Sequence, residues 1–333
     1  MGRRGAALLF GWVVAAGILG AAEARFRADE RSVVWLWDSG RRFATRPGVG
    51  GANAESFREP DDRVEKTPGV IRVAVLGDSM TWGTGAVEEA WPRVADVALD
   101  GGWDLRNFSH YGYDVAQSAA VLREHVWRYA PDLVVYAAYT NDPVESRVVE
   151  IGGGPVWVAP EGLFPMPLRR ASALARRVEG ALLAHTVDGA PDWAFYERHL
   201  RAMVEDAAAH DTPLLVLGLV PHVLSDPDLA ACSARLGVPG RCEEHAAIAA
   251  EQERVSASLR LSHRSVLREL RDAAARGVDL APPDRGDWQH PGKAGHAVIA
   301  EVAAQRLRDW DRGRRPIRVF HQAGGDMRRP AAE

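Results

Sequence analysis

Three apolar runs without polar alternation constrain the fold of this chain more than any other feature. Residues 73–76 read VAVL, residues 132–138 read DLVVYAA and residues 213–219 read PLLVLGL. Strands with apolar residues on both faces are buried on both sides, as in parallel sheets. Because these runs alternate with stretches expected to be helical, the sequence predicts an α/β protein, a three-layer α/β/α sandwich on a parallel sheet.

The expected elements follow one another along the chain. Strands are predicted at residues 72–76, 105–108, 132–138 and 213–219, with a weak fifth near 278–280, which makes about five. Helices are predicted at residues 88–99, 115–129, 193–210, 243–276 and 293–312. Residues 143–190 and 221–242 break the alternation, and we interpret them as insertions. Because both follow the carboxyl ends of strands, we expect them to cover the same edge of the sheet.

Length and composition indicate one ordinary globular domain. The chain has 333 residues, of which 47% are hydrophobic and 26% charged, values typical of soluble proteins. Its net charge of −4 gives no reason to expect nucleic acid as a partner. We predict an irregular connector at residues 25–67, the main domain at 68–312 and a flexible tail at 313–333.

The amino terminus has the pattern of a targeting segment. Arg3 and Arg4 precede an apolar run at residues 6–22, which ends in a small-x-small sequence at 22–24. This order is typical of a secretory signal peptide. The run of 17 residues is also long enough for an uncleaved membrane anchor. Residues 1–24 are therefore predicted as one or the other, and the protein as exported to a periplasmic or extracellular location.

The two cysteines agree with export. Cys232 and Cys242 are separated by a turn-rich spacer that contains Gly237, Pro239 and Gly240. An even count and a short spacer in an exported chain favour a disulfide that closes a surface loop, with two unpaired thiols as the alternative. Two cysteines without an adjacent histidine pair make a structural zinc site unexpected, and we predict no metal.

Four polar segments follow predicted strands or precede the last helix. They are GDS at residues 77–79, NFSHYG at 107–112, TND at 140–142 and DWQH at 287–290. In open α/β sheets, ligand sites lie at the carboxyl ends of the strands. We therefore expect the four segments to meet at one edge of the sheet.

The residue types in these segments fit nucleophilic catalysis. A serine hydroxyl needs a neighbouring base, and a histidine base needs a carboxylate that fixes its tautomer. Ser79, His290 and Asp287 would supply nucleophile, base and acid. The backbone N–H groups of Ser79 and Gly112 and the side-chain amide of Asn141 would stabilise the developing oxyanion.

The order of the motifs resembles that of the SGNH (GDSL) hydrolase superfamily. The resemblance covers residues 72–307, and SFREPDD upstream resembles a segment of exported bacterial members. The four invariant positions of the family would fall on Ser79, Gly112, Asn141 and His290, with Asp287 as the acid. The resemblance implies a flavodoxin-like sandwich and hydrolysis of a small-molecule or carbohydrate ester, without a metal or organic cofactor.

Several aromatic residues lie next to the motifs and are candidates for substrate contact. Tyr139 stands where the family often has glycine, so it would either narrow the pocket or pack beneath it. Trp82, Trp157 and Trp288 would stack on a sugar or serve as ordinary core and loop aromatics. His110 is expected to be a surface histidine, with substrate contact as the alternative.

Two further ionisable residues receive structural interpretations. Asp78 is expected to anchor the turn that carries Ser79 instead of serving as the triad acid. His296 lies inside the last predicted helix and is expected to be structural.

The leading functional hypothesis is an exported serine esterase that removes acetyl or another short acyl group from a carbohydrate. An O-acyltransferase acting on envelope polysaccharide would use the same residues. A lipid esterase is a further alternative, in which leucines at residues 163–183 form a lid. A non-catalytic envelope binding protein is the hypothesis from a different class. Membrane attachment through residues 6–22 is compatible with each.

Overall fold

The computed structural model describes residues 3–36, 39–59, 63–151, 154–159, 161–186 and 189–314. Its centre is a five-stranded sheet in the order β4-β3-β5-β8-β9, with every neighbouring pair parallel. The strands are β3 (Ile71–Gly77), β4 (Trp103–Asn107), β5 (Leu133–Ala138), β8 (Leu214–Gly218) and β9 (Ser262–Ser265). In chain order this is 2-1-3-4-5, the flavodoxin-like arrangement. The predicted fold class is confirmed.

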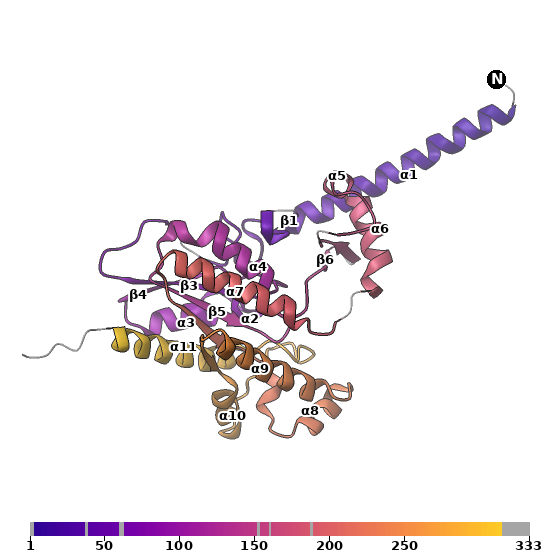
Figure 1. Ribbon diagram of the computed structural model, residues 1–333. Coiled ribbons are helices and arrows are strands. Elements are labelled where there is room, and N and C mark those ends of the chain that lie inside the picture. The colour runs from indigo at the N-terminus through magenta and orange to yellow at the C-terminus, as the bar shows by residue number, and fades with distance from the viewer. Residues whose placement is uncertain are drawn as a thin grey trace, which may run out of the picture.

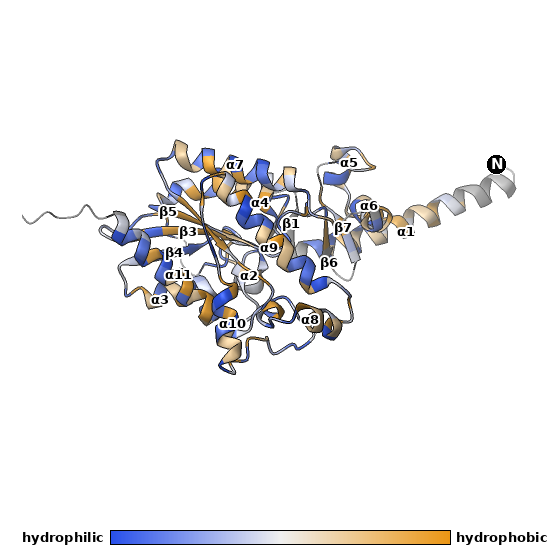
Figure 2. Cartoon of the chain, turned by 60° about the horizontal axis from the view of Figure 1, so that its bottom comes forward, coloured by the Kyte–Doolittle hydropathy of each residue, from blue (hydrophilic) through white to orange (hydrophobic). Residues whose placement is uncertain are grey.

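Side chains of successive strand residues enter two separate cores. Val73 and Val75 pack in a cluster with Trp91 of α3 (Trp91–Ala98). Ala74 and Leu76 pack in the other cluster, which includes residues of α4 (Val115–Val121) and α7 (Trp193–Ala209). Figure 1 shows α4 and α7 on one side of the sheet and α3 and α11 on the other, and Figure 2 shows apolar central strands between polar outer helix faces. These are the three predicted layers.

The outer helices lie close to their predicted ranges. They are α3 (Trp91–Ala98), α4 (Val115–Val121), α7 (Trp193–Ala209) and α11 (Lys293–Arg314). After α4 the chain continues through a π-helical turn (Leu122–Val126) and a 3-10 turn (Trp127–Tyr129). A short 3-10 turn (Val87–Glu89) precedes α3. The tail from residue 315 onward lies outside the described residues.

The fifth strand differs from the prediction. Residues 243–276 form two helices, α9 (Arg241–Ser258) and α10 (Leu267–Ala275), and β9 lies between them. Residues 278–280 are not a strand. The chain turns after α9 at Arg260, which has a φ of 58°. Because β9 pairs only with β8 and is partly exposed, its sequence SHRS lacks the apolar run that marked the other strands.

The turn after β3 requires glycine. A Cβ atom at Gly77 would lie 2.6 Å from Thr81 Oγ1 and 3.1 Å from the carbonyl oxygen of Ala137. The next residues cap and begin the short helix α2 (Ser79–Trp82). The sheet therefore presents Ser79 at its carboxyl edge.

The connector is more regular than predicted. Helix α1 (Arg3–Val33) continues past residue 25, supported by ion pairs one turn apart between Glu23 and Arg27 and between Arg25 and Asp29. Within the described ranges, no helix combines the length and apolarity that crossing a membrane requires. The strands β1 (Val34–Leu36) and β2 (Phe43–Thr45) then form an antiparallel pair, with 3-10 turns at Ser39–Arg41 and Val49–Gly51.

The first insertion forms a small unit beside α1. It contains the hairpin β6 (Val148–Ile151) and β7 (Gly154–Trp157), helices α5 (Met166–Ala171) and α6 (Ala173–Leu183), and a 3-10 turn (Ala184–Thr186). In both views α5 and α6 lie next to α1 and apart from α2. The exposed Leu168 and Leu182 belong to α5 and α6, and these helices lie apart from α2 instead of covering it as a lid would.

The second insertion contains the predicted disulfide. It consists of a 3-10 turn η7 (His222–Ser225) and helix α8 (Leu229–Leu236), followed by the start of α9. Cys232 on α8 is bonded to Cys242 on α9. Both sulfur-bearing residues are 1% exposed, so the bridge joins two packed helices instead of closing a loop at the surface.

We predict that the double substitution Cys232→Ala and Cys242→Ala lowers the free energy of unfolding by about 2–3 kcal/mol, because the bridge restricts a short loop in the unfolded chain. Urea unfolding followed by circular dichroism measures the change. A reductant should cause a similar loss in the wild type and none in the double variant. An equal response of both proteins to reductant would contradict this prediction.

Candidate active site

Ser79, His290 and Asp287 lie in one hydrogen-bonded chain at the carboxyl edge of the sheet. The distance between Ser79 Oγ and His290 Nε2 is 2.8 Å, and that between His290 Nδ1 and Asp287 Oδ2 is 2.7 Å. With Nδ1–H donating to the carboxylate, Nε2 is free to accept the serine proton. The geometry is that of a nucleophile with its base and its orienting acid.

The loop between α10 and α11 arranges the acid and the base. Asp287 Oδ1 accepts hydrogen bonds from the backbone N–H groups of Gln289 and His290, each 3.0 Å long. Partial burial favours a higher pKa for Asp287, but these N–H groups and the His290 ring outweigh it and hold the pKa below its ordinary value. Asp287 is therefore ionised at neutral pH, as an orienting acid must be.

Asp78 anchors the start of α2, as the sequence predicted. Its side chain accepts a hydrogen bond of 2.9 Å from the backbone N–H of Met80 and interacts with the side chain of Asn141. Asp78 is 1% exposed, and burial raises its pKa despite these hydrogen bonds. Asp142 beside it is also buried with a raised pKa, and accepts a 2.5 Å hydrogen bond from Tyr136.

The three predicted oxyanion donors come from loops that touch one another. Within the described part of the chain, the backbone N–H groups of Ser79 and Gly112 donate no hydrogen bond to a backbone carbonyl group. Asn141 interacts with Asp78, the neighbour of Ser79. Gly112 has a φ of 69°, a conformation that favours glycine, and it is exposed.

Two hydrogen bonds tie the Gly112 loop to its surroundings. The hydroxyl of Tyr111 donates to the carbonyl oxygen of Gly83 at the end of α2, over 2.8 Å. The hydroxyl of Ser146, in the first insertion, donates to the carbonyl oxygen of Gly112, over 2.7 Å. The loop therefore lies between the helix that carries Ser79 and the start of the insertion.

Most aromatic residues predicted to contact substrate are buried. Trp82 and Tyr139 are each 1% exposed and Trp157 is 4% exposed, so none offers a face for a ligand. Tyr139 packs in the core, and its hydroxyl donates to Gln289 Oε1, in the loop that carries His290, over 3.3 Å. Trp288 alone is half-buried. These side chains pack in the interior, and their positions next to the motifs in the sequence did not indicate this burial.

Tyr111 and Arg58 are two residues near the site that the sequence analysis missed. Tyr111 is 38% exposed and directly precedes Gly112. Arg58 is buried and donates to the carbonyl oxygens of Trp82, Gly83 and Gly85, which fixes the chain after α2. Arg58 belongs to the SFREPDD segment, so the resemblance of that segment to exported family members could have indicated a role for Arg58.

His110 is not a surface histidine. It is 1% exposed, its Nδ1 lies 2.9 Å from the carbonyl oxygen of Tyr111, and its Nε2 lies 2.6 Å from the backbone nitrogen of Thr45. Its ring stacks on Tyr113. His110 thereby fastens β2 to the Gly112 loop. His296 is also buried, in agreement with the structural role predicted for it.

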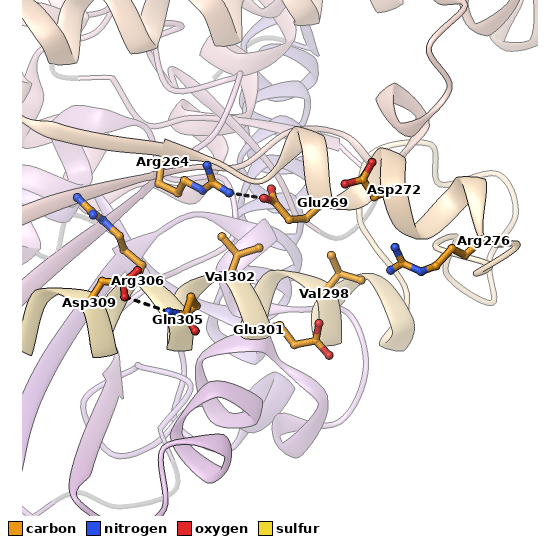
Figure 3. A pocket seen from close by; sticks show the side chains of 10 residues that line it. All are labelled: Arg264, Glu269, Asp272, Arg276, Val298, Glu301, Val302, Gln305, Arg306 and Asp309. Atoms are coloured by element: carbon orange, nitrogen blue, oxygen red, sulfur yellow. Dashed lines mark hydrogen bonds and ion pairs between the residues drawn. The ribbon is translucent and has the colours of Figure 1, made fainter. Parts of the chain in front are cut away.

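The structure also contains a cavity away from these loops. A space of about 530 Å³ lies between α10 and α11, and its lining contains none of Ser79, Asp287 and His290. Figure 3 shows positively charged arginine side chains and negatively charged carboxylate side chains around this cavity. Across the described ranges, no group of three or more His, Cys, Asp and Glu side chains is placed to hold a metal ion.

No protein-family model matches the chain, and no curated protein sequence matches it either. Solved structures are similar to it over 72% of its length. A GDSL-like lipase from Bacteroides thetaiotaomicron has a TM-score of 0.41, 15% identity and 88% of its own chain covered. A carbohydrate acetylesterase family member from Sinorhizobium meliloti has a TM-score of 0.42, 17% identity and 98% of its own chain covered. A member of the lipolytic G-D-S-L family from Veillonella parvula has a TM-score of 0.43, 14% identity and 99% of its own chain covered.

We predict that acidification destabilises the protein through His110. Burial lowers the pKa of His110 to about 4 from an ordinary value of 6.5. The neutral ring thus stabilises the fold fully above pH 6.5, and this contribution is lost as the pH falls toward 4. His110→Gln keeps an acceptor but does not titrate. Urea unfolding at several pH values should show that wild type loses more stability than His110→Gln between pH 6.5 and 4. Parallel losses would contradict this.

Proposed function

We propose that this protein is a serine esterase of the SGNH (GDSL) hydrolase superfamily. The observation that supports the proposal most strongly is the chain of hydrogen bonds from Asp287 through His290 to Ser79. Four motif segments in the order of that family supply every residue of the site. In this proposal Ser79 is the nucleophile, His290 the general base and Asp287 the residue that orients it.

The reaction would proceed through an acyl-enzyme. Ser79 Oγ attacks the ester carbonyl carbon while its proton moves to His290 Nε2. The oxyanion accepts hydrogen bonds from the N–H groups of Ser79 and Gly112 and from the Asn141 amide. Collapse breaks the bond to the alcohol, which leaves with the proton of His290. Water, deprotonated by His290, then releases the acid and restores Ser79.

We propose a short acyl group, and a carbohydrate as the alcohol. The buried ring of Tyr139, two residues before Asn141, occupies space that a glycine at this position would leave open to a longer acyl chain. Tyr111 presents an exposed ring next to Gly112, and a ring of this kind can stack on a sugar. Trp288 is a second, half-buried aromatic residue in the loop of His290.

We predict that Ser79→Ala and His290→Ala each lower kcat/KM for p-nitrophenyl acetate by about 10³-fold or more, because each removes an essential member of the triad. A series of p-nitrophenyl esters from acetate to palmitate measures both activity and chain length. Activity should fall steeply with chain length. Ser258→Ala, at an exposed serine on α9, is the matched control and should retain wild-type activity.

Two results would contradict this proposal. Full activity of Ser79→Ala would exclude the mechanism, and a preference for palmitate would exclude the short acyl group. Product analysis with an added acceptor sugar separates hydrolysis from transfer. Free acid alone supports the esterase, and an acylated sugar would make the protein an acyltransferase that uses the same residues.

We further propose that the protein is exported and keeps residues 6–22 as a lipid attachment. Glu23 is the middle residue of the cleavage-like sequence at 22–24, and its carboxylate accepts hydrogen bonds from Ser172 Oγ and from the N–H groups of Ala173 and Leu174. Cleavage after Ala24 would remove this cap from α6. Glu30 also pairs with the buried Arg176, so the second half of α1 is part of the domain.

The first half of α1 supports attachment to lipid. Figure 1 shows it projecting away from the domain. Phe10, Trp12 and Ile18 are 70%, 75% and 64% exposed, and they point in different directions around the helix. We propose that lipid covers these exposed apolar side chains without the helix crossing the membrane.

We predict that the protein made in a Gram-negative host retains its N-terminal segment and sediments with membranes, because Glu23 holds that segment to the domain. Intact-mass measurement after fractionation provides the test. As a control, residues 1–22 replaced by a cleavable signal peptide should yield soluble periplasmic protein. A wild-type protein that begins at residue 25 and stays soluble would contradict retention.

A further inference from the structure

Two histidines outside the triad contact the loops that carry it. The first is His222 at the start of η7. Its Nε2 lies 3.0 Å from the backbone carbonyl oxygen of Asp287, and its backbone N–H donates to the carbonyl oxygen of Gln289 over 3.1 Å. A carbonyl oxygen can only accept, so His222 Nε2 carries the hydrogen. His222 therefore holds the backbone of the loop that contains the acid and the base.

The second is His245 on α9, which contacts the other side of the site. Its Nδ1 lies 2.7 Å from the hydroxyl oxygen of Thr140, the buried residue that precedes Asn141. The ring also packs edge-on against Trp288, with centroids 5.1 Å apart. About two turns further along the helix, Gln252 Nε2 donates to the carbonyl oxygen of Tyr139 over 2.7 Å. Helix α9 thus holds the loop of the predicted oxyanion residue.

Both histidines belong to one continuous segment. We call residues 222–245 the brace. It contains η7, α8 and the first turn of α9, and η7 packs against both α8 and α9. The disulfide between Cys232 and Cys242 joins the two helices between the two histidines. Because η7, α8 and α9 are packed and cross-linked, a movement of His222 relative to Asp287 would also move His245 relative to Thr140.

We propose that the brace positions the two halves of the active site relative to each other, with His222 holding the Asp287–His290 loop and His245 holding the Thr140–Asn141 loop. This inference rests on the proposed esterase mechanism. The hydrogen bonds of the two histidine rings go to the backbone of Asp287 and to the hydroxyl of Thr140, so in this proposal both are positioning residues. The distance between base and oxyanion donors matters because misplacement by about 1 Å costs on the order of 100-fold in rate.

The chain allows a test by isosteric substitution. Glutamine can place its amide nitrogen near the position of a histidine Nε2, and asparagine can place a polar atom near that of Nδ1. His222→Gln and His245→Asn therefore keep the respective contacts, whereas His222→Leu and His245→Leu remove them. Thermal unfolding of all four variants establishes that each is folded at the assay temperature.

We expect the two leucine variants to lower kcat for p-nitrophenyl acetate by about 10- to 100-fold with little change in KM, and the amide variants to recover most of the loss. His222→Leu should also move the acid limb of the kcat/KM profile down by about one pH unit, because a displaced Asp287 stabilises the imidazolium less. His245→Leu should leave that limb in place. A loss of stability alone would not produce this difference between the two variants.

Nuclear magnetic resonance of ¹⁵N-labelled histidine provides a readout that does not depend on ester turnover. The Nδ1–H resonance of His290 reports its hydrogen bond to Asp287. We expect it to be weakened in His222→Leu and retained in His222→Gln and in Ser79→Ala. This measurement separates failure of the brace from failure of the proposed esterase function.

Unchanged kcat and an unchanged His290 resonance in folded leucine variants would overturn the inference. Equal losses in the leucine and amide variants would also overturn it, because the hydrogen bonds would then not be the cause. If wild type proves inactive on every ester, the esterase proposal fails, and the resonance still decides whether His222 orients the Asp287–His290 pair.

Discussion

Burial of the central sheet on both faces is the constraint on which the rest of this structure depends. Residues 73–76 of β3 are completely buried, and the neighbouring strand β5 is buried throughout. Such strands have no room for catalytic polar groups along their length, since each would lose its hydration. Polar chemistry is therefore confined to the strand ends. The parallel order brings Ser79, the Gly112 loop and Asn141 to the same edge.

The N-terminal connector is a structural part of the site. Phe43 and Phe57 are buried in the core that includes α4 and α7. The backbone of Thr45 is hydrogen-bonded to His110, and Arg58 holds the carbonyl groups after α2. The loops that surround Ser79 are thus fixed from one side by the connector and from the other by η7 and α9. Residues separated by about 200 positions in the chain jointly define the geometry of one serine.

Sequence patterns found the central strands but missed the edge. Strands β3, β5 and β8 were recognisable because double-sided burial leaves an apolar run. Strand β9 was read as helix because one of its edges is free, so its sequence SHRS need not be apolar. The aromatic residues show the same limit. Trp82 lies close to Ser79 in sequence but is 1% exposed, whereas Tyr111, which was not predicted to contact substrate, is exposed. Burial depends on neighbours that adjacent sequence does not specify.

The sequence predicted the fold class, favoured the pairing of the two cysteines and singled out Ser79, Asp287 and His290, which the structure places in one hydrogen-bonded chain. Each of these predictions follows from local residue type and from order along the chain. The tertiary structure, in contrast, shows that His110 is buried, that Glu23 joins α1 to α6, and that His222 and His245 contact the loops of Asp287 and Thr140. The physical reason is that these interactions join segments far apart in the chain. Their distances are set by how helices pack on the sheet, and no local pattern of residues encodes them.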